Sequence, residues 1–311
     1  MPMIRTLTTS LAVALLCSAG AFAQSDTAVD LRPHWEAGHK SVYEFWGQHE
    51  RVTTRSIAGQ SDDSSLSVES RGQVTWVVDR VKPDGSYACT MVLDWMEATY
   101  QTPDGRKLKS DSRKGSGEPE AMHDRLRAMA GVPLTVEVAA DGSITKLTGV
   151  DKMKRKAKDA ETIPEELDFI ETAADLATLV AAPKSLEPGK SWNTDFRWSH
   201  ELGHLEHDVT YTLAGVEHIE GIRLATVNGK SKLKLDVDRS GFPAGGPQIN
   251  IRLIEGAADT QVLFDLQRHE AIGRNSSHSE TVEMTMRNQN ISINVRMTTR
   301  VQGQILRISE E

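Results

Sequence analysis

Short turn signals punctuate this chain at intervals, and they constrain its fold more than any other feature. Asp-Gly occurs at 84–85, 104–105 and 141–142, and Asn-Gly occurs at 228–229. Each dipeptide stands between runs of alternating apolar and β-branched residues. Both residue types tolerate the positive φ that a two-residue hairpin turn requires. The pattern therefore predicts a series of antiparallel hairpins.

Helical signals are fewer and lie in the middle of the chain. Residues 119–130 place three large apolar side chains at helical spacing, with Gly131 just beyond them. A second helical segment begins with a capping box at Thr162 and continues as an apolar stripe to Pro183. We expect a mainly β (α+β) fold made of two antiparallel β-rich halves with a few helices between them.

The chain is therefore divided into four expected segments. A weak repeat supports the two halves, because Glu36-Ala-Gly38 and Glu187-Pro-Gly189 both precede strand-rich stretches. Residues 61–70, which are polar and rich in serine, are expected to form a mobile loop. The segments are a signal peptide at 1–23, an N-terminal β-rich half at 24–150, a helical connector at 151–183 and a C-terminal β-rich half at 184–311.

The first 23 residues have the features of a secretory signal peptide. Arg5 gives a positive start, residues 11–16 are apolar, and Ala21-Phe22-Ala23 forms a cleavage site. The apolar run is too short to span a bilayer. We expect an exported protein, periplasmic or extracellular, that begins at Gln24.

The charge balance argues against nucleic acid as a partner. The whole chain has a formal net charge of −8. Removal of residues 1–23 takes away Arg5 and no acidic residue, which leaves 35 − 44 = −9. Nucleic-acid phosphates require basic surfaces. No second long apolar run follows, so no transmembrane segment is expected.

Cys89 is the single cysteine that remains after cleavage, so no internal disulfide is expected. It lies in a stretch that reads as a strand, at 87–93. We interpret it as a small buried apolar side chain and not as a catalytic thiol.

The stretch from Trp198 to Tyr211 contains His200-Glu201-Leu-Gly-His204, the letter pattern of a zinc protease. That chemistry requires a helix, on which two histidines one turn apart hold the metal while the glutamate activates its bound water. The flanking residues are poor helix formers, and Gly203 lies inside the pattern. A helix is therefore not expected here.

A β-hairpin explains the same residues better. We expect Gly203-His204 to form the turn, so that His200 faces His207 and Glu201 points to the opposite face. The apolar and aromatic side chains then share one face of the hairpin. A zinc-dependent hydrolase that uses His200, Glu201 and His204 is kept as the alternative, and metal binding by His200 and His207 is left open. No catalytic, cofactor-binding or metal site is assigned.

Several short stretches distributed along the chain carry a family resemblance. Besides the signal segment, they are Trp35–Gly38, Met129–Val138 leading to Asp141-Gly142, Tyr211–Gly215 and Phe264-Asp265. With these features the chain resembles a family of uncharacterised exported bacterial proteins that carry a domain of unknown function. The resemblance extends over most of the chain and implies export and a β-rich fold. It brings no known activity and no catalytic residues.

These observations favour an exported, non-enzymatic β-rich binding or envelope protein. Long antiparallel meanders form curved sheets, and their concave face suits a lipid-like ligand or an envelope protein as partner. No cofactor is expected. A structural envelope protein is the remaining alternative.

Overall fold

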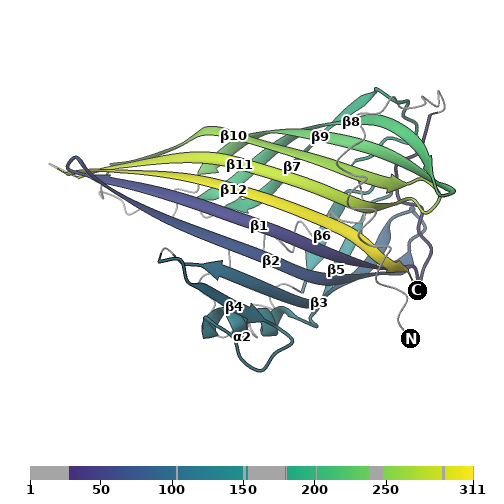
Figure 1. The fold of residues 1–311 in the computed structure, drawn as a ribbon. Coiled ribbons are helices and arrows are strands. Elements are labelled where there is room, and N and C mark those ends of the chain that lie inside the picture. The colour runs from purple at the N-terminus through teal and green to yellow at the C-terminus, as the bar shows by residue number, and fades with distance from the viewer. Residues whose placement is uncertain are drawn as a thin grey trace.

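The computed structural model describes residues 28–102, 104–149, 152, 179, 181–200, 202–237, 248–288 and 291–310. Within them lie twelve strands and the helix α2 (Figure 1). In chain order the elements are β1 (Lys40–Ile57), β2 (Gln60–Val81), β3 (Tyr87–Gln101), β4 (Lys107–Asp111), α2 (Glu120–Met129), β5 (Pro133–Val138), β6 (Ile144–Thr148), β7 (Ser191–His200), β8 (Gly203–Ile219), β9 (Ile222–Val237), β10 (Gln248–Asp265), β11 (Glu270–Asn288) and β12 (Ile291–Glu310).

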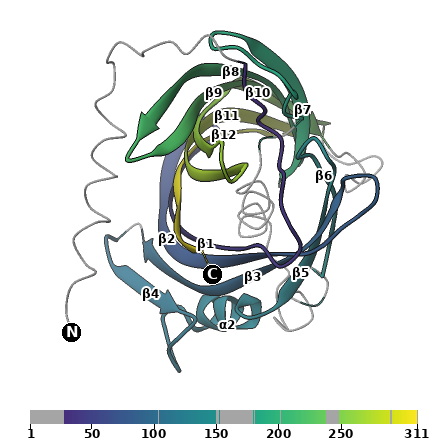
Figure 2. The ribbon, with the colours of Figure 1, turned by 90° about the vertical axis from the view of Figure 1, so that its right-hand side faces the viewer.

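All strands belong to one antiparallel sheet. Its order is β6-β5-β3-β2-β1-β12-β11-β10-β9-β8-β7, with β4 beside β3. β1 and β12 pair along almost their whole length, from Ser41↔Glu310 to Ile57↔Ile293, and so join the two ends of the described chain. The mainly β prediction is confirmed. The sheet curls strongly, so that it has an inner and an outer face (Figure 2).

Two clusters of buried apolar side chains lie on the inner face near one end of the sheet. The first contains Tyr43 and Trp76, and α2 contributes Leu126 to it. The second contains Val227 and Phe264. All five side chains are almost completely buried, which identifies these clusters as the cores of the fold.

The segment before β1 connects the two cores. It runs inside the curl (Figure 2), where Val29 and Leu31 pack in the second core and Trp35 packs in the first. The Tyr87 hydroxyl donates a hydrogen bond to the carbonyl oxygen of Pro33, at 2.8 Å. We call the part of the sheet that contains both cores and this segment the closed end.

Three of the four predicted turns are confirmed. Asp84-Gly85, Asp104-Gly105 and Asp141-Gly142 connect β2 to β3, β3 to β4 and β5 to β6. Each glycine has a positive φ between 81° and 87°. Asp-Gly predicts a turn correctly at these positions, because glycine adopts a positive φ without steric cost.

The prediction of a turn at Asn228-Gly229 is wrong, because both residues lie inside β9. A Cβ atom at Gly229 would lie 2.7 Å from Cε1 of Tyr211 on the neighbouring strand. The glycine therefore serves the packing of an aromatic ring across the strand and not a chain reversal.

The Ser-rich stretch 61–70 is also a correction, because it is part of β2. The chain reverses just before it at Ala58 and Gly59, which have φ values of 49° and 85°. Every residue of the stretch then pairs with β1, from Ser61↔Ser56 to Ser70↔Gly47. Pairing with a neighbouring strand overrides the weak intrinsic preference of polar residues.

The two halves of the predicted repeat enter the sheet in the same way. The amide of Gly38 donates to the carbonyl oxygen of Val78, and the amide of Gly189 donates to that of Leu213, both at 2.7 Å. Both glycines have a positive φ, of 90° and 83°. The turns before β1 and β7 therefore share their geometry, while the duplication and the four-segment division stay predictions.

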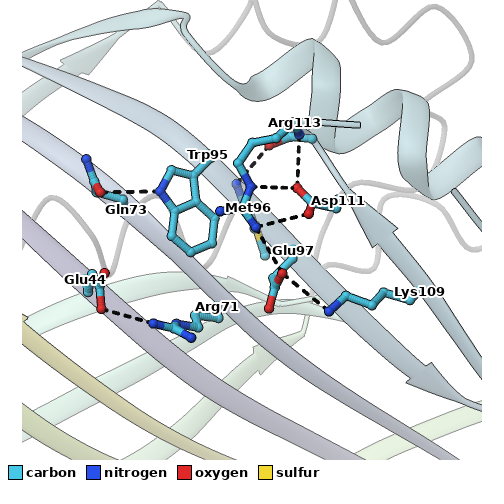
Figure 3. A network of polar contacts seen from close by, with 10 residues as sticks. Glu44, Arg71, Gln73, Trp95, Met96, Glu97, Lys109, Asp111 and Arg113 are labelled. Carbon is cyan, nitrogen blue, oxygen red and sulfur yellow. Dashed lines mark hydrogen bonds and ion pairs between the residues drawn. The ribbon is translucent and has the colours of Figure 1, made fainter. Parts of the chain in front are cut away.

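A polar network fixes β4 and the loop before α2 against the outer face of β3 (Figure 3). The guanidinium of Arg113 lies 3.9 Å from the ring centre of Trp95 and donates two hydrogen bonds to the carboxylate of Asp111. It also donates to Glu97, at 3.1 Å. Hydrogen bonds from Arg113 hold the pKa of Asp111 below its usual value although burial opposes this. Both a cation–π contact and charged hydrogen bonds thus stabilise this corner.

Two further predictions, the helix at 119–130 and the buried Cys89, agree with the structure. The helix predicted at 119–130 is confirmed as α2. Cys89 is buried in β3 and unpaired, and burial raises the pKa of its thiol to about 12, as expected for an inert side chain. The signal peptide and residues 162–178 of the second predicted helix lie outside the described residues.

Candidate binding face

The sheet continues past the closed end as a narrowing flap, seen at the left of Figure 1. We define the flap as residues 248–256 of β10, 280–288 of β11, 291–299 of β12, 51–57 of β1 and 60–66 of β2. These are the same strands that build the closed end. The alternation of side chains between the two faces therefore continues into the flap.

The inner face of the flap is apolar on β10, β11 and β12. Met284, for example, lies opposite Ile251 on one side and Val295 on the other. Ile251 and Val282 are buried, and the other side chains of this surface are half-buried. The apolar surface consists of Ile249, Ile251, Leu253, Val282, Met284, Met286, Ile293, Val295 and Met297.

The outer face of the same strands is polar. Arg252 donates a hydrogen bond to Glu283 on the neighbouring strand, at 2.7 Å, and Asn294 and Arg296 are exposed. The two faces thus differ in polarity even though both are accessible to some extent. Strand formation does not require an apolar inner face this far from the cores. A contiguous apolar surface that is not fully buried is typical of a binding site.

The flap separates from the neighbouring part of the sheet between β9 and β10. Within the described residues, the pairing of these strands ends at Ala257↔Lys232. β9 nevertheless continues to Val237 beside β8, and β10 extends back to Gln248 beside β11. The side chain of Leu233 lies over Gly256, where a Cβ atom would approach it to 2.9 Å. In the part of the chain that the structure describes, β10 has no strand paired to it along residues 248–256 on the side away from β11.

A row of polar side chains crosses the inner face between the apolar surface and the cores. We call it the polar belt: His207 of β8, Ser231 of β9, His278 and Glu280 of β11, and His49 and Arg51 of β1. The register puts Glu280 and Arg51 in one cross-strand row through Thr299, and His278 and His49 in the next row through Val301.

Contacts link the belt side chains to one another. Nδ1 of His207 lies 3.2 Å from the Ser231 hydroxyl, and the imidazole stacks on Phe196 at 4.6 Å. The His207 and His278 rings lie 5.9 Å apart, and Nε2 of His278 is 3.6 Å from a carboxylate oxygen of Glu280. Burial and the nearby His278 lower the pKa of His207 to about 3, so this imidazole is neutral at pH 7.

A second polar cluster closes the opposite end of the inner face. The carboxylate of Glu270 accepts a hydrogen bond from the Ser41 hydroxyl at 2.7 Å and lies 3.0 Å from Nε2 of His39. The guanidinium of Arg307 pairs with the same carboxylate. Because these residues come from β1, β11, β12 and the preceding turn, the cluster ties the strand ends together.

The backbone at the zinc-protease pattern is a hairpin, as predicted. β7 contains His200 and β8 contains His204, and the two strands pair antiparallel. The helix that a zinc protease needs at this pattern is not what these residues form. Glu201 lies outside the described residues.

The predicted register of this hairpin is wrong, because each residue of β7 pairs with a residue four positions earlier on β8 than expected. His200 pairs with Gly203, so the chain turns before Gly203 and not at Gly203-His204. His207 consequently lies opposite Phe196 and not opposite His200. Gly203 has a positive φ of 142°, which favours glycine, but it lies just after the turn and not at the first position of the turn as predicted. The predicted apolar face is right, because Leu205, Val209 and Tyr211 are all buried.

Histidine, cysteine and acidic side chains do not gather in groups of three suited to a metal ion anywhere in the part of the chain that the structure describes. His207, which was left open as a metal ligand, contacts Ser231, Phe196 and His278. Sequence reasoning missed both the apolar surface and the belt. The alternation in β10–β12 was visible, but it does not reveal which of the alternating positions stay half-buried.

The comparisons with known proteins find a family similarity over part of the chain. Residues 84–176 match the model of a family of unknown function, DUF6263. The expected resemblance to proteins with a domain of unknown function is thereby confirmed over this segment, which extends from the β2–β3 turn past β6. No curated protein matches this chain.

Solved structures resemble the chain only loosely. One, described as showing lipid–protein interactions in lipovitellin, has 10% identity and a TM-score of 0.46. The match covers 89% of this chain and 26% of that chain, so this chain spans about a quarter of its length. A DUF1329 family protein from Desulfovibrio piger has 9% identity and a TM-score of 0.14, with coverage of 81% and 83%. At these scores neither similarity bears on function.

No helix in the described ranges has the length and apolar character needed to cross a membrane.

Proposed function

We propose that this chain is an exported, non-enzymatic binding protein that holds a lipid-like ligand against the inner face of the flap. The observation that carries this proposal is the contrast between the two faces of β10–β12. The inner face presents nine apolar side chains, most of them half-buried, and the outer face of the same strands is polar.

The dimensions and composition of this surface support an acyl chain as the ligand. Nine residues of an antiparallel strand extend over about 30 Å, which is enough for a long extended acyl chain. Met284, Met286 and Met297 surround Val295 in the register of β11 and β12. Methionine side chains are flexible and polarizable, so they adapt to apolar ligands of variable shape.

Export rests on the predicted signal peptide at residues 1–23. A lipid carrier in the cell envelope fits that location, because acyl chains need shielding from water when they move between membranes.

The test is a titration of the purified, delipidated protein with a fluorescent fatty-acid analogue. We expect saturable binding near one ligand per chain. Val295→Asn on the inner face should weaken binding about five- to tenfold, because an apolar contact is replaced by an amide. Asn294→Ser, on the outer face one residue earlier, is the matched control and should leave the affinity unchanged.

Circular dichroism and the denaturation midpoint establish that both variants are folded. The proposal fails if the folded protein shows no saturable binding, or if both substitutions weaken binding equally. A second readout is mass spectrometry of lipids extracted from the protein as isolated from its source, in which an acyl-containing species is expected at near-stoichiometric amount.

A further inference from the structure

The position of the polar belt adds a second property to the ligand, and the argument rests on the proposed function. The belt lies between two apolar regions of one continuous inner face. On one side Val282 and Met297 begin the apolar surface of the flap, one cross-strand row from Glu280 and Thr299. On the other side, beyond a row of small residues, lie the core residues Phe45 and Ile305.

An acyl chain on the flap would therefore end at the belt. A polar group can reach the half-buried belt side chains His49, Arg51 and His278 there. His207 and Glu280 are only 1% and 5% exposed, and Glu280 lies in the same cross-strand row as Arg51. Polar groups in such surroundings interact strongly, because little water is present to screen them.

The charges of the belt nearly cancel. It contains one guanidinium, on Arg51, and one carboxylate, on Glu280, and its other members are three imidazoles and a hydroxyl. His207 is neutral at pH 7 because of its burial. The belt thus offers both hydrogen-bond donors and acceptors but little net charge to pair with an ion.

Among the described strands, the other charged side chains on the inner face lie away from the belt. Arg55 lies directly opposite Asp62 further out on the flap, and Arg307 pairs with Glu270 at the far end. Arg274 is four residues from His278 along β11, about 13 Å away along the strand.

We infer that the ligand is an amphiphile whose head group carries no net charge, bound with its head at the polar belt and its acyl chain along β10–β12. Two head-group types share this chemistry: a zwitterion such as phosphocholine, and an uncharged polyol such as glycerol. An anionic carboxylate would gain Arg51 as a partner, but it would also face Glu280 in the same row, and the repulsion offsets the gain.

The experiment compares ligands that share one acyl chain and differ in the head. Lysophosphatidylcholine, monoacylglycerol, the fatty acid and the alkyl trimethylammonium salt each compete with a fluorescent acyl probe for the delipidated protein at pH 7.5. We expect at least one of the two neutral heads to bind about tenfold or more tightly than both charged heads. The order of the two neutral ligands then identifies the head-group type.

Two substitutions shift the balance in opposite directions. Glu280→Gln leaves a net positive belt and should raise the affinity for the fatty acid about tenfold relative to the neutral ligands. Arg51→Gln leaves a net negative belt and should raise the affinity for the cationic amphiphile about tenfold relative to the neutral ligands. Glu283→Gln, on the outer face of β11, removes the same charge and should change neither ratio.

The outcomes separate the two proposals. Equal or tighter binding of the fatty acid by the unaltered protein overturns the neutral-head inference while the apolar binding function stands. Failure of all four amphiphiles to displace the probe, or absence of probe binding, overturns both. Should Glu280→Gln fail to fold, the test is the affinity of Arg51→Gln for the cationic amphiphile relative to the neutral ligands. Arg51 is half-buried, and its substitution leaves the His278–Glu280 contact in place.

Discussion

The two ends of this sheet use the same strands in different ways. At the closed end the inner face of β1, β2 and β10 carries aromatic and branched side chains that are almost fully buried, such as Phe45, Trp76 and Phe264. On β10, β11 and β12 of the flap the inner face is also apolar, but most of it is half-buried, and its largest side chains are methionines. The comparison teaches that apolar alternation alone does not distinguish a core from a surface that is available for a ligand.

The largest expected effect comes from truncating one apolar side chain at each end. Phe264→Ala removes a fully buried ring from the second core and should lower the free energy of unfolding by about 3–5 kcal/mol. Ile293→Ala on the half-buried face of the flap should cost about 1 kcal/mol or less. Urea denaturation of both variants checks this. Equal losses would show that the flap is a core like the closed end.

The next effect concerns pH, at the boundary between the two regions. His207 takes up a proton near pH 6.5 when unfolded, but burial lowers its pKa to about 3 when folded. The unfolded state therefore binds more protons below pH 6.5, and stability falls as the pH drops toward 3. By pH 4 this single group should remove about 3 kcal/mol of the stability present at pH 7.

The measurement is the change in unfolding free energy between pH 7 and pH 4 for the protein and for His207→Asn. The asparagine keeps an acceptor near Ser231 but does not titrate, so the variant should show a pH dependence weaker by about that amount. His218→Asn, at an exposed position on the same strand, serves as the control and should leave the dependence intact. An unchanged slope in His207→Asn would contradict the assigned burial.

The smallest expected effect compares two outer-face arginines. Arg113→Ala removes a cation–π contact and leaves the buried carboxylate of Asp111 without its main partner, so a loss of about 1–2 kcal/mol is expected. Arg252→Ala breaks an exposed ion pair on the flap and should change stability by less than about 0.5 kcal/mol. Thermal or urea unfolding distinguishes the two, and similar values would remove the distinction between a fixed corner and a solvated face.

Local rules predicted the fold class and part of the topology. The Asp-Gly turns at 84–85, 104–105 and 141–142 follow from backbone sterics alone, and α2 follows from its apolar spacing. Where the rules failed, a distant neighbour decided. Tyr211 from β8 requires a residue without a side chain at Gly229, and β1 turns the Ser-rich stretch into a strand.

The candidate site was beyond sequence reasoning for a related reason. The alternation of β8 and β7 correctly placed Leu205 and Tyr211 on one face, but the hairpin register depended on a turn before Gly203 that has no strong sequence signal. The polar belt is assembled from β1, β8, β9 and β11, and the register between β1 and β12 cannot be derived from either strand alone.

The pairing of β1 with β12 has a consequence for how the protein is made. During synthesis β1 and β2 emerge first, yet one edge of β1 stays without its partner until the strand from Ile291 to Glu310 has been produced. Closing so long a loop is slow, and until then a long strand edge is open to pairing with other chains. A chaperone that shields this edge until β12 has been made would meet a requirement set by the topology itself.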